Sequence, residues 1–228
     1  MTRVAVVLCG CGRFDGSEIH EAVLSLLHLA RGGADWEALA PDRPQWAVCE
    51  HFGGEPVAGE ERSQLAEAAR IARGRVKPLG EARVEDYDAL LLPGGSGATR
   101  NLADFAERGG AGECIPELAA LLRAFHAAGK PIGAVCIAPA LVALALGHHR
   151  PRLTLGPPDG AAAREAARTG AQMVDCPVDG IVEDPDHRLL STPAYVIGPG
   201  IAEVDAGIGR LVARLLEWCA EGAAAPPR

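Results

Sequence analysis

Short apolar runs alternate with amphipathic segments along most of the chain. Apolar residues recur with helical spacing in the segments between the runs, whereas the runs themselves have the length of buried strands. Runs of the strand type occupy residues 4–8, 36–40, 76–79, 89–92 and 132–135. Helical spacing marks residues 17–31, with Ser17 as the N-cap, 61–73 and 115–128. Alternating strands and helices predict an α/β fold with a mostly parallel sheet and helices on both faces.

The second half of the chain continues this alternation with shorter elements. Strands are predicted at 153–155 and 173–176, helices at 137–146 and 160–169, and a hairpin over 178–192 that turns at 183–186. A final amphipathic helix covers 201–219. Residues 41–60 are rich in Pro, Gly and charge and are interpreted as an excursion from the core, with a short strand at 47–52. The pattern predicts a single domain over 1–220 and a frayed tail over 221–228.

Composition narrows the class of protein. The formal net charge is −8 and the isoelectric point is near 5.4. Nucleic acids and anionic membrane surfaces are bound through basic patches, so neither is an expected partner. No apolar run approaches the ~18 residues of a membrane-spanning helix. The run over 4–8 is also shorter than the ~7–15 residues of a signal-peptide core.

The seven cysteines are odd in number and scattered in position. That distribution argues against a disulfide framework and favours a reducing, cytoplasmic compartment. Cys9 and Cys11 form the one close pair, but they lack the spacing of zinc or redox motifs. No other spacing typical of metal ligands occurs, so no metal is expected. Six of the seven histidines are interpreted as surface residues: His20, His28, His126, His148, His149 and His187.

Cys136 stands between the apolar run 132–135 and the helix expected over 137–146. A strand, a sharp turn and a helix in direct succession are typical of a nucleophile elbow. The elbow exposes its side chain at a helix N-terminus, where the dipole and the free N–H groups favour a thiolate. We therefore predict that Cys136 is a nucleophile with a lowered pKa. The alternative is a thiol that merely packs in the core.

Two further features fall at the same predicted sheet edge. Pro93 and the glycines Gly94 and Gly95 follow the run 89–92, and their backbone N–H groups are candidates for an oxyanion hole together with the N–H of Ile137. Glu18 follows the first strand and is the candidate proton partner of Cys136. A first-turn glutamate that favours the helix dipole is the alternative interpretation. Asp15 and Glu21 share that alternative and have less reason to point inward.

These residues resemble the ThiJ/PfpI superfamily. The likeness rests on the elbow 135–139, the loop 92–95 and Glu18, and it sharpens over 10–21 and in the segments 68–71, 176–178 and 192–195. Those segments are similar to the isoprenoid-biosynthesis (ElbB) glyoxalase branch, over residues 3–216. The resemblance implies a flavodoxin-like fold related to class I glutamine amidotransferases, and a homodimer. It also assigns Cys136 as the nucleophile and Glu18 as its acidic partner.

The resemblance implies a glyoxalase, a lyase that acts on glyoxal or methylglyoxal without a cofactor and possesses a related deglycase activity. Cys136 would form a hemithioacetal that rearranges to glycolate or lactate. The sequence departs from amidotransferases because Ile137, not histidine, follows the cysteine and because 192–194 lacks a histidine. Glutaminase and protease functions are therefore disfavoured. Two alternatives stay open: an oxidation-sensing or partner-binding protein without turnover, and a scaffold with a vestigial thiol.

Overall fold

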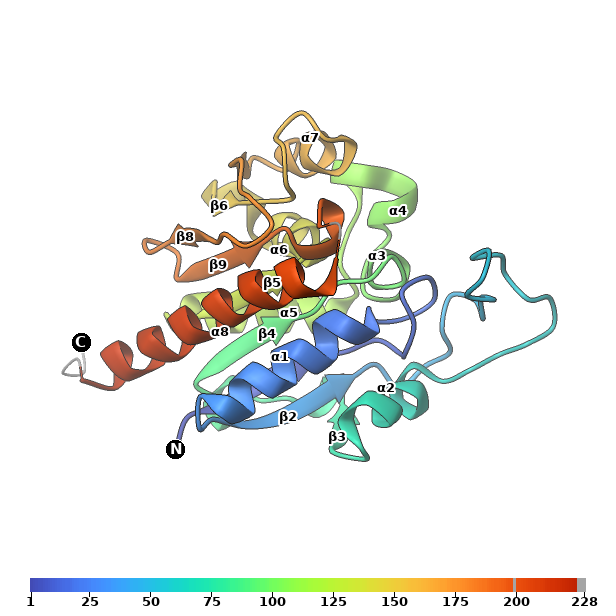
Figure 1. Ribbon diagram of the computed structural model, residues 1–228, viewed down its shortest axis with the longest axis horizontal. Coiled ribbons are helices and arrows are strands. Elements are labelled where there is room, and N and C mark those ends of the chain that lie inside the picture. The colour runs from blue at the N-terminus through green and yellow to red at the C-terminus, as the bar shows by residue number, and fades with distance from the viewer. Residues whose placement is uncertain (199, 225–228) are drawn as a thin grey trace.

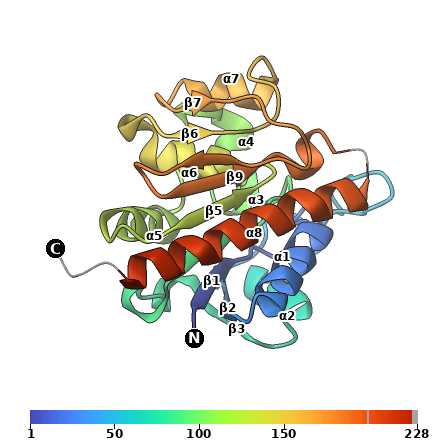
Figure 2. The ribbon, with the colours of Figure 1, turned by 60° about the vertical axis from the view of Figure 1, so that its left-hand side comes forward.

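The computed structural model describes residues 1–198 and 200–224. Its main sheet has seven strands in the order β3-β2-β1-β4-β5-β9-β8. All neighbours in it pair in parallel except β8, which runs antiparallel to β9. A separate parallel pair, β6–β7, lies beside the sheet, with β6 next to β8 and β9 (Figure 1), and Figure 2 shows both strands of the pair. The strand bounds are β1 Arg3–Val7, β2 Asp35–Ala40, β3 Val76–Pro78, β4 Ala89–Leu92, β5 Ile132–Val135, β6 Arg152–Leu153, β7 Gln172–Met173, β8 Val182–Asp184 and β9 Leu189–Thr192.

Helices cover both faces of the main sheet. Helices α1, α2 and α8 lie on one face, and α1 and α8 run side by side along it (Figure 2). The opposite face carries α5 and α6, with α3, α4 and α7 around them. The helix bounds are α1 Ile19–Arg31, α2 Gln64–Ala72, α3 Ala98–Asn101, α4 Phe105–Arg108, α5 Pro116–Ala127, α6 Ala138–Leu146, α7 Ala161–Ala167 and α8 Ile201–Ala224. The predicted flavodoxin-like α/β fold is therefore confirmed.

The strands are apolar on both faces because each face meets helices. In β1, Val4 and Val6 point into the core under α1 and α8, whereas Ala5 and Val7 point into the core under α5 and α6. Successive side chains of a strand alternate between faces, so a strand buried on both sides reads as one continuous apolar run. This is why the short runs of the sequence mark the central strands so closely.

Several predicted elements need correction. The N-cap of α1 is Glu18 rather than Ser17, whose Oγ accepts a hydrogen bond from the Cys9 N–H at 3.0 Å. No strand forms over 47–52; one isolated bridge joins Cys49 to Pro56. The hairpin turn, predicted at 183–186, begins only after Asp184, where β8 ends. The predicted tail begins inside α8, and residues 225–228 lie outside the described residues.

Candidate active site

Four loops meet at the carboxyl edge of the sheet and enclose a cavity of about 470 Å³. They follow β1, β4, β5 and β9, which are strands far apart in sequence but close neighbours in the sheet. Parallel α/β sheets place their sites at this edge, and the prediction that it gathers the candidate residues is confirmed. The lining residues are Arg13, Glu18, His20, Gly95, Ser96, Cys136, Tyr195 and Gly198.

Cys136 occupies a strained turn between β5 and α6. Its φ is 61°, in the left-handed region that non-glycine residues rarely adopt. The Cys136 N–H donates to the Thr192 carbonyl at 2.9 Å, so the ladder between β5 and β9 holds the residue before the chain turns. Pro139 stands at the start of α6, where its missing N–H costs nothing. The turn leaves Cys136 8% exposed at the floor of the cavity, which is the geometry of a nucleophile elbow.

Glu21 is the carboxyl that contacts Cys136. Its side chain is 0% exposed and lies beside the Cys136 thiol, whose pKa its charge raises. Glu21 Oε2 also accepts from the Gly94 N–H at 3.0 Å, and Oε1 accepts from the Tyr195 N–H at 3.3 Å. The expectation that Glu21 has less reason than Glu18 to point inward is therefore wrong. Three elements of the site, the loops after β4, β5 and β9, converge on this one carboxyl.

Glu21 and the Cys136 thiol both have pKa values that differ from those of the same groups in water. Burial, and to a smaller extent the nearby charge of Glu18, raises the pKa of Glu21 to about 7. Burial also raises the pKa of the Cys136 thiol well above its ordinary value, and the charge of Glu21 raises it further. The Gly95 and Ile137 N–H groups act in the opposite direction but do not prevail. The expected lowering of the Cys136 pKa is wrong, because burial beside a second acid outweighs the helix terminus.

Glu18 lines the same cavity but has a different local role. Its carboxylate accepts from the Glu21 N–H at 2.7 Å and so caps α1. Its backbone N–H donates to the Gly94 carbonyl at 2.9 Å, which ties the start of α1 to the loop after β4. The structure therefore brings Glu18 near Cys136 as predicted, yet assigns the direct contact with the thiol to Glu21.

The backbone N–H groups that were predicted to form an oxyanion hole do not all have the same partner. The N–H groups of Gly95 and Ile137 lie near the Cys136 thiol and act to lower its pKa. The Gly94 N–H already donates to Glu21 and is not free to bind an oxyanion, which corrects the prediction for this residue. Gly94 is needed for space: a Cβ there would lie 2.6 Å from Cys136 Cβ and 2.8 Å from Glu21 Oε2. Gly95 has a φ of 110°, and a Cβ at this position would lie 2.6 Å from the Glu18 backbone nitrogen.

A histidine that was predicted to be a surface residue also lines the cavity. His20 is in the first turn of α1, and its Nδ1 lies 2.8 Å from the Tyr195 hydroxyl. The backbone of Tyr195 in turn donates to Glu21. His20 is solvent-exposed, as expected, but faces the reactive group. Its partner Tyr195 lies 175 residues further along the chain, so only the packing of β9 beside β5 reveals the pair.

The excursion 41–60 supports the loop after β1. The carbonyl of Asp15 accepts from Gln45 Nε2 at 2.8 Å and from Asn101 Nδ2 at 2.7 Å. Asp15 Oδ2 accepts from the Cys49 N–H at 2.8 Å, so the buried Asp15 joins the excursion to the loop. The excursion thus fixes the loop that carries Arg13 and Glu18 into the cavity.

The other cysteines differ from Cys136 in position. All seven are unpaired, and Cys136 is the one that lines the cavity. Burial raises the pKa of Cys9, Cys114 and Cys219 to about 12, as it raises that of Cys136, but none of these three thiols lines the cavity. Within the residues that the structure describes, no group of three or more His, Cys, Asp or Glu is placed to hold a metal ion.

The raised pKa of Glu21 predicts a pH dependence of stability. Its ordinary pKa of 4.5 rises to about 7 on folding, so the folded state favours the protonated acid. The resulting stabilisation is full below pH 4.5 and is lost as the pH rises through about 7. The loss amounts to about 3 kcal/mol. Urea unfolding of wild type and Glu21→Gln at about pH 4.5 and pH 8 will isolate this contribution. An identical pH dependence in the two proteins would contradict the assignment.

The fold and the site define an α/β protein with a nucleophile-elbow cysteine beside a buried carboxyl. The chain matches the DJ-1/PfpI family over residues 13–184. It therefore belongs to the DJ-1/PfpI family, as the resemblance to the ThiJ/PfpI superfamily predicted. Within the described residues, no helix is long and apolar enough to span a membrane.

Two curated relatives are similar over most of their length. The human glutamine amidotransferase-like class 1 domain-containing protein 3, mitochondrial, is 41% identical and shares 94% of this chain and 82% of its own. The mitochondrial ES1 protein homologue of Rattus norvegicus is 42% identical over 94% of this chain and 83% of its own. Their names place those two proteins in mitochondria, and the predicted cytoplasmic location of this chain is not confirmed.

Solved structures agree with the fold. An isoprenoid biosynthesis protein with an amidotransferase-like domain from Ehrlichia chaffeensis has a TM-score of 0.89 and 36% identity, covering 96% of this chain and 99% of its own. A variant of a DJ-1 superfamily protein from Salmonella typhimurium has a TM-score of 0.59 and 26% identity over the whole of both chains. The predicted likeness to the isoprenoid-biosynthesis branch is confirmed at the level of this similarity.

Proposed function

We propose that this protein is a cofactor-free glyoxalase that converts glyoxal or methylglyoxal into glycolate or lactate. The observation that supports it is the Cys136 thiol, which lines a cavity and has the buried carboxyl of Glu21 beside it. A general base acts best when its pKa lies near the working pH, and the pKa of Glu21 is about 7. The carboxylate lies beside the thiol from which it would take a proton.

The first step is addition of the thiol to the aldehyde. The Cys136 sulfur forms a bond to the aldehyde carbon while its proton passes to Glu21. The carbonyl electron pair becomes an alkoxide, which the N–H groups of Gly95 and Ile137 stabilise. The proton then moves from Glu21 to the alkoxide, giving a hemithioacetal and a carboxylate. Attack in this form requires no free thiolate, which suits a thiol whose pKa is raised.

The second step is isomerisation, and the third is hydrolysis. Glu21 removes the hydrogen of the carbon bonded to sulfur as a proton and returns it to the neighbouring carbon, through an enediolate. The hydroxyl proton of the first carbon passes to the oxygen of the neighbouring carbon, so that the first carbon becomes the thioester carbonyl. His20 and Tyr195 donate hydrogen bonds to the enediolate oxygen from the cavity wall. The resulting thioester is attacked by water, the C–S bond breaks, and the sulfur regains its proton. The sum is dicarbonyl plus water to hydroxy acid, with no net oxidation.

Glu18 keeps a proposed role in the same site. Its charge contributes, after burial, to the raised pKa of Glu21, so we expect it to shift the pH at which the base is ionised. We also retain two expectations that accompany the function. A homodimer is expected and is tested by light scattering at cellular concentration. The seven unpaired cysteines favour a reducing compartment such as the cytoplasm.

Oxidation sensing is the competing function. It needs a thiolate, because peroxide reacts with that form of cysteine, and the raised pKa of Cys136 disfavours it. The deciding experiment incubates the purified protein with glyoxal, without glutathione and in a buffer free of amines, and follows glycolate by NMR. The proposal expects many glycolate molecules per protein molecule. Formation of glycolate no faster than in a protein-free control would contradict the proposal. Peroxide-dependent oxidation of Cys136 would then support oxidation sensing.

A further inference from the structure

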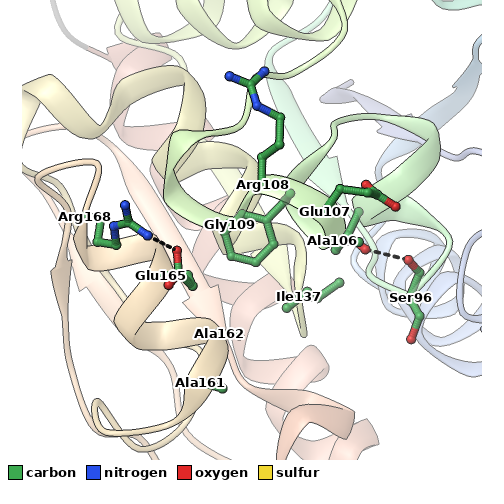
Figure 3. A pocket seen from close by; sticks show the side chains of 12 residues that line it. Ser96, Ala106, Glu107, Arg108, Gly109, Ile137, Ala161, Ala162, Glu165 and Arg168 are labelled. Carbon is green, nitrogen blue, oxygen red and sulfur yellow. Dashed lines mark hydrogen bonds and ion pairs between the residues drawn. The ribbon is translucent and has the colours of Figure 1, made fainter.

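A second cavity, of about 590 Å³, adjoins the one that contains Cys136. The two cavities share Ser96, and the second is also lined by Ile137, whose N–H lies near the Cys136 thiol. Figure 3 shows Ile137 at the centre of this cavity, with Ser96 on one side and Ala161 and Ala162 on the other. A molecule bonded to Cys136 therefore has the second cavity directly beside its reacting carbon.

The wall beside Ile137 is apolar. Phe105 of α4, Ala106 next to it and the two alanines at the start of α7 surround Ile137. Short side chains at 161 and 162 leave the volume open, since longer ones would project into it. Apolar surface of this kind favours an apolar ligand by about 25 cal/mol per Å² removed from water.

The charged residues at the rim are already paired. Arg108 forms an ion pair with Asp104 at 2.9 Å. Figure 3 shows the second pair, in which Arg168 contacts Glu165 at 2.9 Å. Glu107 is bound by Arg100. A charged ligand group would have to displace one of these partners, whereas an uncharged chain would not. The rim therefore disfavours an ionic substituent on the substrate.

Size argues against glyoxal as the best-fitting substrate. Pockets of roughly 300–1,000 Å³ bury ligands of drug size, and each of the two cavities falls in this range. A molecule with two carbons leaves nearly all of this volume unused. Resting on the glyoxalase function proposed above, we infer that the preferred substrates are 2-oxoaldehydes with an uncharged apolar chain, which lies against Ile137 and α7 in the second cavity.

The kinetic test compares glyoxal with 2-oxooctanal in three proteins. Wild type is expected to have a kcat/KM at least about tenfold higher for 2-oxooctanal. Ala161→Phe fills the second cavity. It is expected to lower kcat/KM for 2-oxooctanal by about tenfold and to change kcat/KM for glyoxal by no more than about twofold. Ala167→Phe is the matched control, because Ala167 is exposed on the same helix and does not line the cavity. Equal kcat/KM values in wild type, or equal effects of the two variants, would overturn the inference.

A binding measurement separates this inference from the proposed function. Calorimetry with 1-hydroxy-2-octanone, a neutral analogue that cannot form the hemithioacetal of an aldehyde, reports the cavity without turnover. Weaker binding to Ala161→Phe than to Ala167→Phe supports the apolar ligand class even if no 2-oxoaldehyde is consumed, in which case the glyoxalase function alone fails. Binding that Ala161→Phe does not weaken overturns the ligand class, whether or not glyoxal is turned over.

Discussion

Cys136→Ala is expected to lower kcat for glyoxal by about 10³-fold or more. The sulfur forms the covalent bond in the proposed reaction, and no other group in the cavity is placed to replace it. The loss should appear as absence of glycolate in the NMR time course. A methyl group in place of the thiol also removes the partner of Glu21, so the variant's thermal unfolding must be recorded beside its activity.

Cys11→Ala is the matched control for this change. Cys11 is half-buried in the loop after β1, at the same edge of the sheet, but it does not line the cavity. Its removal should leave kcat within about twofold, as for substitutions away from reacting groups. Steady turnover by Cys136→Ala, or equal losses in the two variants, would rule out attack by the elbow thiol.

Glu21→Gln is expected to lower kcat by about 10²–10⁴-fold, the usual contribution of a general acid–base group. An amide cannot accept the thiol proton or carry a proton between two carbons. Glu18→Gln is the control, since it lies one turn earlier, lines the cavity and keeps an oxygen to cap α1. It should retain kcat within about tenfold and shift the pH dependence, because its charge raises the pKa of Glu21. The reverse ranking of the two variants would return the role of base to Glu18.

The elbow was predictable from sequence because its signals are local. An apolar strand, a cysteine and a helix with an early proline follow one another without a gap, from Ile132 to Leu146. The carboxyl ends of parallel strands lie at one edge of a sheet. The loops that carry Gly95 and Glu18 were therefore also predictable as neighbours of Cys136.

The choice between Glu18 and Glu21 depends on the register of α1. The buried face of this helix contains Glu21, Ala22, Ser25, Leu26 and Leu29. Glu21 precedes Ser25 by four residues and therefore lies on the same face. The polar character of both residues conceals a helical pattern that a search for apolar positions alone does not detect. The signal was present in the sequence and would have favoured Glu21.

Other features depend on contacts between distant segments. His20 meets Tyr195 only because β9 lies beside β5 in the sheet. The raised pKa of Cys136 follows from burial and from Glu21, neither of which a short motif contains. The short helices α3 and α4 have four residues each, too few to show a helical period.

The central claim is that Glu21 takes the proton of the Cys136 thiol as the sulfur attacks, and the rate at which iodoacetamide alkylates Cys136 tests it most directly. Mass spectrometry of the Cys136 peptide gives this rate between about pH 5 and pH 9, whatever the substrate is. Coupled acids lose their protons in two steps, so wild type should show a rate that rises through about pH 7 and then levels off. Glu21→Gln should show a continuous rise without a plateau. A plateau that persists in Glu21→Gln, or a rate in wild type that does not change near pH 7, would contradict the account.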